Sequence, residues 1–210
     1  DRAVALGLSD AVQLSVLCLP ALAHALLPGA AARLLQACPH ARLSVTPQES
    51  PLLEEWMSAQ RFDLGLGEQT ATPPGTQAEV LLTLDEVAVL PAGHALAMRP
   101  VLGLDDFAGL PFVSLSADDP YRRQIDALFA QAGVQRQLRL ETHSAVAVCA
   151  MVQQGLGVAI VNPLTALAGV NGAGGGLVLR RLAFSVPFSV SMVRPLFRAP
   201  LPEVAPMVAA

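Results

Sequence analysis

Polar residues and prolines recur at the points where a predicted strand passes into a predicted helix. They are Cys18-Leu19-Pro20, Gln48-Glu49-Ser50-Pro51, Asp118-Asp119-Pro120, Thr142-His143-Ser144 and Asn162-Pro163. Proline suits the first position of a helix, where its missing N–H costs nothing. Each helix start therefore offers backbone N–H groups that attract carboxylates. The pattern predicts a set of anion-binding helix ends, although ordinary helix capping explains any one of them alone.

Acidic and basic side chains stand beside these helix starts. Glu49 and Glu68 each follow a predicted strand, where a carboxylate can receive an ammonium group. Arg122, just inside a predicted helix, can bind a ligand carboxylate through its planar guanidinium. Helix ends and carboxylates together match a zwitterion, that is, an amino acid. Glu49 and Glu68 can equally be solvated loop residues. The alternative for Arg122, which the sequence favours, is an exposed salt bridge with Asp118 or Asp126.

An enzymatic function has little support in the sequence, which holds no GxSxG, HExxH, GxGxxG or P-loop motif. Cys18 is a candidate thiolate nucleophile, and Cys149 with His143 would complete a two-cysteine racemase. No base stands beside Cys18 to activate it, however. The three cysteines, of which the third is Cys38, are widely spaced, which argues against a disulfide scaffold or a zinc site and fits a reducing cytoplasm. We therefore predict a cytoplasmic non-enzyme with no catalytic residues, cofactor or metal.

The composition indicates one or two domains with a large core. Of 210 residues, 53% are hydrophobic and 14% charged, and the formal net charge is −4. All 13 basic residues are arginine. Without a polybasic patch, these residues are not expected to bind nucleic acid or an anionic membrane by themselves. Two long stretches without charge, 11–32 and 142–179, are interrupted by proline, glycine and polar residues. They are expected to be buried strand–turn–helix segments and not membrane spans.

Strands and helices alternate along the chain. Strands are predicted at 14–17, 43–46, 63–66, 86–90, 112–115, 138–141, 158–161, 177–182 and 188–193. Helices are predicted at 20–36, after Ser50-Pro51, at 104–107, 120–131, 144–154 and after Pro202. The alternation predicts an α/β fold with parallel sheets covered on both faces. It runs twice, so we expect two similar lobes: lobe I from 13–87 and 185–210, and lobe II from 88–184. Residues 1–12 are expected to be a linker remnant, because the chain starts at Asp1 with no signal-peptide pattern.

Sequence motifs spread over most of the chain resemble the effector-binding domain of LysR-type transcriptional regulators, from Gln13 to about Leu201. The generic motifs are LLP (26–28), DLGL (63–66), LPAGHALA (90–97), PYRRQIDALFAQAG (120–133) and GLGVAIV (155–161). The more specific motifs are PQESPLLEEWMSAQRFDLGL (47–66), LDEVAVLP (84–91), ETHSAVAVCAMV (141–152), VNPLTAL (161–167) and VPFSVSMVRPL (186–196). The second set resembles the branch of the family that responds to diaminopimelate and activates the diaminopimelate decarboxylase gene of lysine biosynthesis.

This resemblance implies a periplasmic-binding-protein-like fold of type 2. Two Rossmann-like lobes would be joined by two crossover strands, near Val87–Leu90 and Ser185–Phe188. The family also has an N-terminal winged helix-turn-helix, absent from these residues, through which alone the full regulator would bind promoter DNA. The full regulator is expected to be a homodimer or homotetramer. The helix after Pro20 and the strand Leu43–Val45 of one subunit would meet the Ser144–Gln154 region of another.

The resemblance also implies an effector site between the lobes, at the loops that follow the strands. Lobe I would contribute Cys18, Leu19, Pro20, Ala21, Glu49, Ser50 and Glu68, and lobe II would contribute Ser114, Ser116, Arg122, Thr142, His143 and Asn162. The implied effector, diaminopimelate, has two carboxylates and two ammonium groups, which agrees with the zwitterion predicted from the residues. One alternative is a sensor for another basic amino acid (lysine, arginine or ornithine) or for an opine. The other is a periplasmic amino-acid-binding protein of the same fold.

Overall fold

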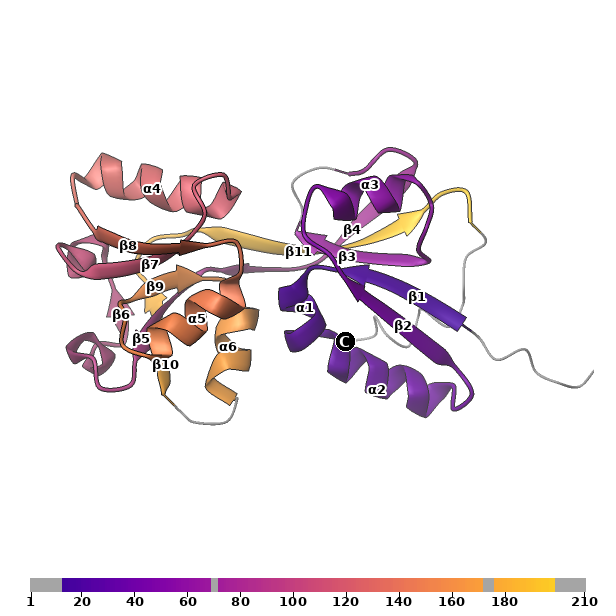
Figure 1. Ribbon diagram of the computed structural model, residues 1–210, viewed down its shortest axis with the longest axis horizontal. Helices are drawn as coiled ribbons and strands as arrows, with labels where there is room; N and C mark the ends of the chain where they lie inside the picture. The colour runs from indigo at the N-terminus through magenta and orange to yellow at the C-terminus, as the bar shows by residue number, and fades with distance from the viewer. Residues whose placement is uncertain (1–12, 69–71, 172–175, 199–210) are drawn as a thin grey trace, which may run out of the picture. The chain divides into compact units, whose positions relative to one another are not determined.

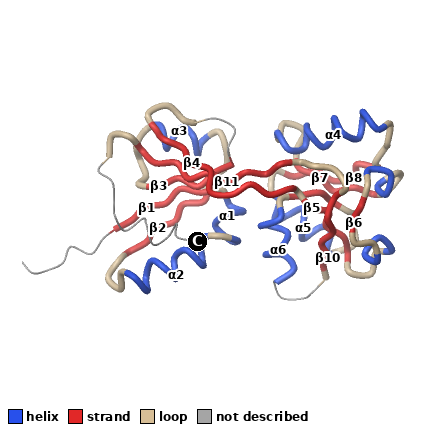
Figure 2. Tube along the Cα trace, turned by 180° about the vertical axis from the view of Figure 1, so that it is seen from behind, coloured by secondary structure: helices blue, strands red, loops and turns tan. Residues whose placement is uncertain are grey.

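The computed structural model describes residues 13–68, 72–171 and 176–198, which belong to two compact units (Figure 1). Unit 1 takes in the described residues up to Leu81 and those from Val190 onward, and unit 2 spans Leu82–Ser189. The chain passes between the units twice, within the paired strands β4 (Thr76–Asp85) and β11 (Pro187–Pro195) (Figure 2). The terminal helix predicted after Pro202 and the linker at 1–12 lie outside the described residues.

The crossover predicted near Val87–Leu90 is wrong. Those residues form β5 (Val87–Pro91) inside unit 2, and the first passage between the units lies earlier, in β4. Most β4 residues are exposed or half-buried, so this strand lacks the apolar run that marks a buried strand in a sequence. The second predicted crossover, Ser185–Phe188, overlaps the start of β11. The units therefore divide at 81/82 and 189/190, not at the predicted 87/88 and 184/185.

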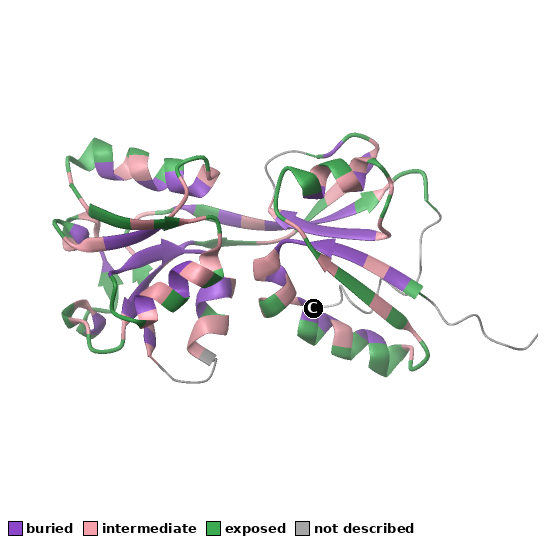
Figure 3. Ribbon diagram, viewed as in Figure 1, coloured by how far each residue is buried: buried purple, intermediate pink, exposed green. Residues whose placement is uncertain are grey.

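In its described residues unit 1 holds a five-stranded sheet with the order β2-β1-β3-β11-β4. The strand β1 (Gln13–Cys18) lies parallel to β2 (Arg42–Pro47) and β3 (Leu64–Glu68), whereas β11 runs antiparallel to β3. Figure 1 shows α3 (Leu52–Ser58) on one face of the sheet, and α1 (Pro20–Ala25) and α2 (Leu27–Ala37) on the other. The strand β1, between β2 and β3, is buried along most of its length, which explains its run of apolar residues (Figure 3).

The single helix predicted over 20–36 is two helices that meet at Leu26. Pro28 has no N–H to donate to the carbonyl of His24, so the first helix cannot continue through it. Pro28 instead occupies the first turn of α2, where no such bond is needed.

Unit 2 has, in its described residues, a four-stranded sheet with the order β6-β10-β5-β9 and a two-stranded sheet of β7 and β8. The new strands are β6 (Val101–Leu102), β7 (Pro111–Leu115), β8 (Gln137–Thr142), β9 (Ala159–Val161) and β10 (Leu177–Leu182). The helices are α4 (Pro120–Ala132), α5 (Ala145–Gln153), α6 (Pro163–Asn171) and the 3-10 turns Ala95–Met98 and Leu104–Phe107.

The sheets are mixed, not parallel as predicted. In unit 2, β5 runs antiparallel to both β10 and β9, while β7 and β8 are parallel. β5 is the first strand after the chain enters unit 2, and β11 carries the second passage between the units. The rule that links alternating helices and strands to parallel pairing does not extend to the pairs that β5 and β11 make.

The core of unit 2 explains the long stretch without charge at 142–179. Val148 and Val152 of α5 pack with buried residues of β5, β7 and β9, including Val89 and Val113. On the other side, Phe107, Phe112 and Phe129 form an edge-to-face cluster beneath α4. No helix in the described part of the chain is both long and apolar enough to cross a membrane.

Candidate functional site

The carboxyl ends of three parallel strands meet at one edge of unit 1. The Gln48 amide donates to the Cys18 carbonyl over 2.8 Å, and the Leu19 amide donates to the Leu66 carbonyl over 3.1 Å. These bonds link the ends of β1, β2 and β3. The predicted lobe I residues follow those ends and lie at this edge: Cys18, Leu19, Pro20, Ala21, Glu49, Ser50 and Glu68.

Cys18 can serve a ligand only through its backbone. Its side chain is fully buried, and burial raises the pKa of the thiol to about 11. The helix α1 starts directly after it, with Pro20 in the first turn, and among the described residues no side chain caps this start. The Leu19 amide already donates to Leu66 and Pro20 has no N–H, so Ala21 carries the backbone donor of this helix start.

The acidic groups of the unit 1 edge are Glu49 and Glu68. Glu49 is exposed and Glu68 is half-buried at the end of β3. The neighbouring Ser50 is exposed, and its hydroxyl donates to the Glu54 carboxylate in the first turn of α3 over 2.7 Å. Ser50 therefore orders the start of α3 beside Glu49.

A second edge of the same kind lies in unit 2. The register of the parallel pair β7–β8 places Leu115 beside Thr142, so Ser114, Ser116 and His143 stand at adjoining strand ends. β9 joins this pair through a parallel bridge between Phe112 and Val158, and it leads to Asn162. Ser114 and Asn162 are buried, Ser116 and Thr142 are half-buried, and His143 is exposed, 3.9 Å from Asp118.

The helix starts of unit 2 are capped by their own side chains. At α4, one Asp119 carboxylate oxygen accepts from the amides of Tyr121 and Arg122, each over 2.9 Å. The Asp119 carbonyl accepts from Arg123, and Pro120 has no N–H. The amides of the first turn are thus satisfied, and these contacts do not support the prediction that this helix end binds a carboxylate. Ordinary capping, the alternative, is what the structure shows.

The caps of α5 and α6 are lighter. The Ser144 hydroxyl accepts from the Ala147 amide over 3.3 Å, and the Asn162 side-chain oxygen accepts from the Thr165 amide over 2.8 Å. Each of these side chains satisfies one amide of its helix, where Asp119 satisfies two. Asn162 is therefore the cap of α6, and it is buried at the end of β9.

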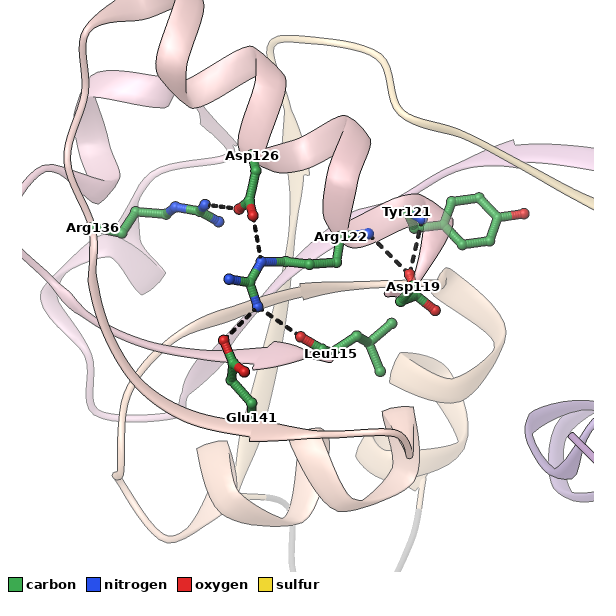
Figure 4. Close-up of polar contacts among 7 residues, drawn as sticks. All are labelled: Leu115, Asp119, Tyr121, Arg122, Asp126, Arg136 and Glu141. Atoms are coloured by element: carbon green, nitrogen blue, oxygen red, sulfur yellow. Dashed lines mark hydrogen bonds and ion pairs between the residues drawn. The ribbon is translucent and has the colours of Figure 1, made fainter. Parts of the chain in front are cut away.

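The Arg122 guanidinium is engaged inside unit 2 (Figure 4). Its side chain is only 7% exposed, and its Nε donates to Asp126 over 2.8 Å. Its Nη1 donates to the Leu115 carbonyl over 2.7 Å and to Glu141 over 3.1 Å. The pairing with Asp126, one turn along the helix, is therefore the alternative that the structure bears out. The prediction that Arg122 presents its guanidinium to a ligand is not supported by these contacts.

The comparison with known protein families covers both edges. Residues 9–210 match the family described as the LysR substrate binding domain. The chain belongs to this family. Transcriptional activator protein LysR of Escherichia coli (strain K12) is 52% identical over 186 residues, which are 89% of this chain and 59% of that protein. Regulatory protein NocR of Agrobacterium tumefaciens (strain T37) is 33% identical over 124 residues, 59% of this chain and 41% of that protein. The chain thus covers less than two thirds of either relative.

Solved structures share the fold of this LysR-family domain, which is that of type 2 periplasmic binding proteins. HinK, a LysR family regulator of Pseudomonas aeruginosa, superposes with a TM-score of 0.78 at 23% identity, over 96% of this chain and 70% of that one. The regulatory domain of Synechocystis PCC6803 CcmR, solved with 2-PG, gives 0.75 at 15% identity, over 92% of both chains. The BenM effector binding domain, solved with benzoate, gives 0.72 at 15%, over 93% of this chain and 88% of that one.

Glu86 is a buried acidic residue of this LysR-family domain that no sequence pattern marks as a site residue. It is only 2% exposed, between β4 and β5, and its amide donates to the Val186 carbonyl over 2.9 Å. Burial first, and the Glu86 charge second, raise the pKa of the Cys149 thiol to about 11. A single acidic residue between two strands is typical of a solvated turn, so the sequence held no signal of its burial.

The two-cysteine chemistry considered above has no reactive thiol to start from. Cys18 and Cys149 are both buried with raised pKa values, so both stay protonated near neutral pH. Within the described ranges, no cluster of three or more His, Cys, Asp and Glu side chains is placed to hold a metal ion.

Proposed function

We propose that this LysR-family domain is the effector sensor of a transcriptional activator, and that its effector is diaminopimelate. The observation that carries the proposal is the pair of edges: strand ends of unit 1 collect carboxylates, and strand ends of unit 2 collect hydroxyls and helix caps. A ligand with both signs of charge needs both kinds of partner. The 52% identity to E. coli LysR over 89% of the chain supports the same family branch.

Each edge has a distinct role in this proposal. Glu49 and Glu68 receive the ammonium groups, and the Ala21 amide donates to one carboxylate, because the Leu19 amide is bonded to Leu66 and Pro20 has no N–H. Ser116, which follows the register partner of Thr142, and Thr142 itself are both half-buried, and they donate hydroxyl hydrogens to the other carboxylate. The remaining predicted residues shape the edges: Cys18, Pro20, Ser50, Ser114, His143 and Asn162. Arg122 has no direct contact in this scheme because its donors are in use.

The effector acts by a shift in population. A ligand that contacts both units favours one angle between them, and it shifts that equilibrium only by its difference in affinity for the two states. The rest of the full-length regulator would carry the winged helix-turn-helix that binds promoter DNA, so we place the protein in the cytoplasm. Exposed Val45 on β2 and Val146 on α5 support a homodimer or homotetramer that pairs these faces.

The proposal is tested by thermal shift and calorimetry on the 210-residue chain. meso-Diaminopimelate should raise the melting temperature, because a ligand that binds only the folded state stabilises it. Leucine, with one ammonium and an apolar side chain, is the negative control. Lysine, arginine, ornithine and an opine complete the panel. Equal binding of diaminopimelate and leucine, or binding of neither, contradicts the proposal. Tighter binding of another panel member reassigns the effector.

A further inference from the structure

The strand ends that carry Ser116 and Thr142 belong to a small sheet. β7 and β8 pair only with each other as a ladder in the described residues, and their register is irregular between Phe112 and Val113. Within the described ranges, the strand contact beyond this ladder is the bridge of Phe112 to Val158, where Val158 exchanges backbone bonds with Pro111 and Val113. A two-stranded sheet is marginally stable by itself. Other contacts must therefore hold these strand ends in place.

Arg122 provides such contacts at the required position. It bonds the carbonyl of Leu115, the residue before Ser116, and the carboxylate of Glu141, the residue before Thr142. Leu115 and Thr142 are register partners, so one guanidinium group ties both strand ends at adjoining points. The Arg122 side chain is 7% exposed, whereas those of Asp126 and Glu141 are 40% and 41% exposed. Arg122 is therefore the buried member of this set of three charged side chains.

A second arginine fixes the helix from which Arg122 extends. Arg136, just before β8, donates to the Asp126 carboxylate and lies over the ring of Phe129, 4.1 Å from its centroid. The same guanidinium lies 4.6 Å from the centroid of Phe112 on β7. Asp126 thus bridges two arginines, and α4 is held along β8 at both ends of that strand (Figure 4). Because α4 is held in this way, the backbone from which the Arg122 side chain extends is fixed in position.

We propose that Arg122 is a positioning residue for the effector site. It keeps the Ser116 and Thr142 hydroxyls at a constant separation by holding the residue before each, and it does not touch the effector. The effect on ligand affinity rests on the function proposed above, whereas the effect on the strand ends does not. Arg122 thereby acts through the two hydroxyls, which makes its contribution to affinity dependent on them.

The first test uses the 210-residue chain without ligand. Amide hydrogen exchange is compared for wild type, Arg122→Met and Arg122→Lys, with Arg123→Met, an exposed neighbour on the same helix, as the control. Both Arg122 variants should exchange faster at 114–117 and 141–144, and less so in Arg122→Lys, which keeps the charge but lacks the planar fork. Unchanged exchange there, or a uniform rise that includes β1 and β3, overturns the proposal. Arg122→Lys decides the result if Arg122→Met does not fold.

The second test is a double-mutant cycle on diaminopimelate affinity. Arg122→Met should weaken binding roughly fivefold, as expected for residues coupled in one network. In a Ser116→Ala, Thr142→Val background the same change should have little further effect. Unchanged affinity in the single variant, or losses that multiply across the cycle, overturns the positioning role. If wild type does not bind diaminopimelate, the proposed function fails, and the exchange experiment alone decides the role of Arg122.

Discussion

The Met57 side chain lies against the backbone of Gly65, where a Cβ on the glycine would be 3.0 Å from the Met57 Cγ and Sδ. This contact lets α3 pack closely on β3. We expect Gly65→Ala to destabilise the fold by about 1–3 kcal/mol, because the methionine must leave its position in a packed core. Gly67→Ala on the same strand is the control, since its Cβ would meet Leu53 at an ordinary 3.5 Å. Urea unfolding of both variants measures the difference, and equal losses would contradict the packing argument.

Asp119 supplies a second prediction, about helix capping and pH. Asp119→Ala should lose about 1 kcal/mol of stability, because two amides of α4 lose their acceptor. Asp119→Asn keeps an acceptor and should lose less. Unfolding by urea near pH 7 compares the two variants, and equal losses would show that the side-chain oxygen is not the cap.

The pH dependence of the same variants has a definite sign. Burial raises the pKa of Asp119 above its usual 3.8, against the hydrogen bonds from Arg122 and Tyr121. The folded state therefore holds this proton more tightly than the unfolded state. The resulting contribution to the free energy of unfolding is fully present below pH 3.8, and it is lost as the pH rises through the raised pKa of the folded state. The stability of wild type relative to Asp119→Asn should fall over that interval, and a rise with pH would contradict the direction of the shift.

The thiols give a third prediction. Cys18 and Cys149 are buried with pKa values raised to about 11, whereas Cys38, at the end of α2, is partly exposed. At about pH 8, an aromatic disulfide reagent should modify Cys38 first and the other two only slowly, because the thiolate is the reactive form. Cys38→Ser should remove the fast phase. All three thiols should react in denaturant, and a fast phase that survives in Cys38→Ser would contradict the burial of the others.

The sequence was informative wherever a local signal matched the tertiary environment. β1 and β9 are apolar runs buried on both faces, and α4 begins at Asp119-Pro120 and ends at Gly133, which adopts a left-handed conformation. These features depend on neighbouring residues alone, so the pattern predicts them. β4 escaped prediction because its surface is mostly exposed.

The candidate site was harder to predict than the fold, because its contacts join distant residues. Sequence patterns place Ser116 and Thr142 at strand ends, but only the β7–β8 register brings Leu115, the residue before Ser116, beside Thr142. The place of Arg122 near a helix start predicts a ligand contact. Its three partners come from its own helix, from the end of β7 and from β8, and no local pattern reveals that they use its donors.

Glu49 supplies the last prediction, about effector binding. Glu49→Gln removes the charge at an exposed position while it preserves the size of the side chain. If Glu49 receives an ammonium group, binding of diaminopimelate should weaken by roughly 1.5–3 kcal/mol, the range for a hydrogen bond to a charged group, and toward the lower end because the site is exposed. Glu55→Gln, an exposed glutamate on α3, is the matched control and should bind like wild type. Calorimetry at two salt concentrations separates a direct ion pair, which keeps most of its effect, from long-range attraction, which salt screens. Equal affinity in Glu49→Gln and Glu55→Gln would remove Glu49 from the site and leave Glu68 as the acid to test.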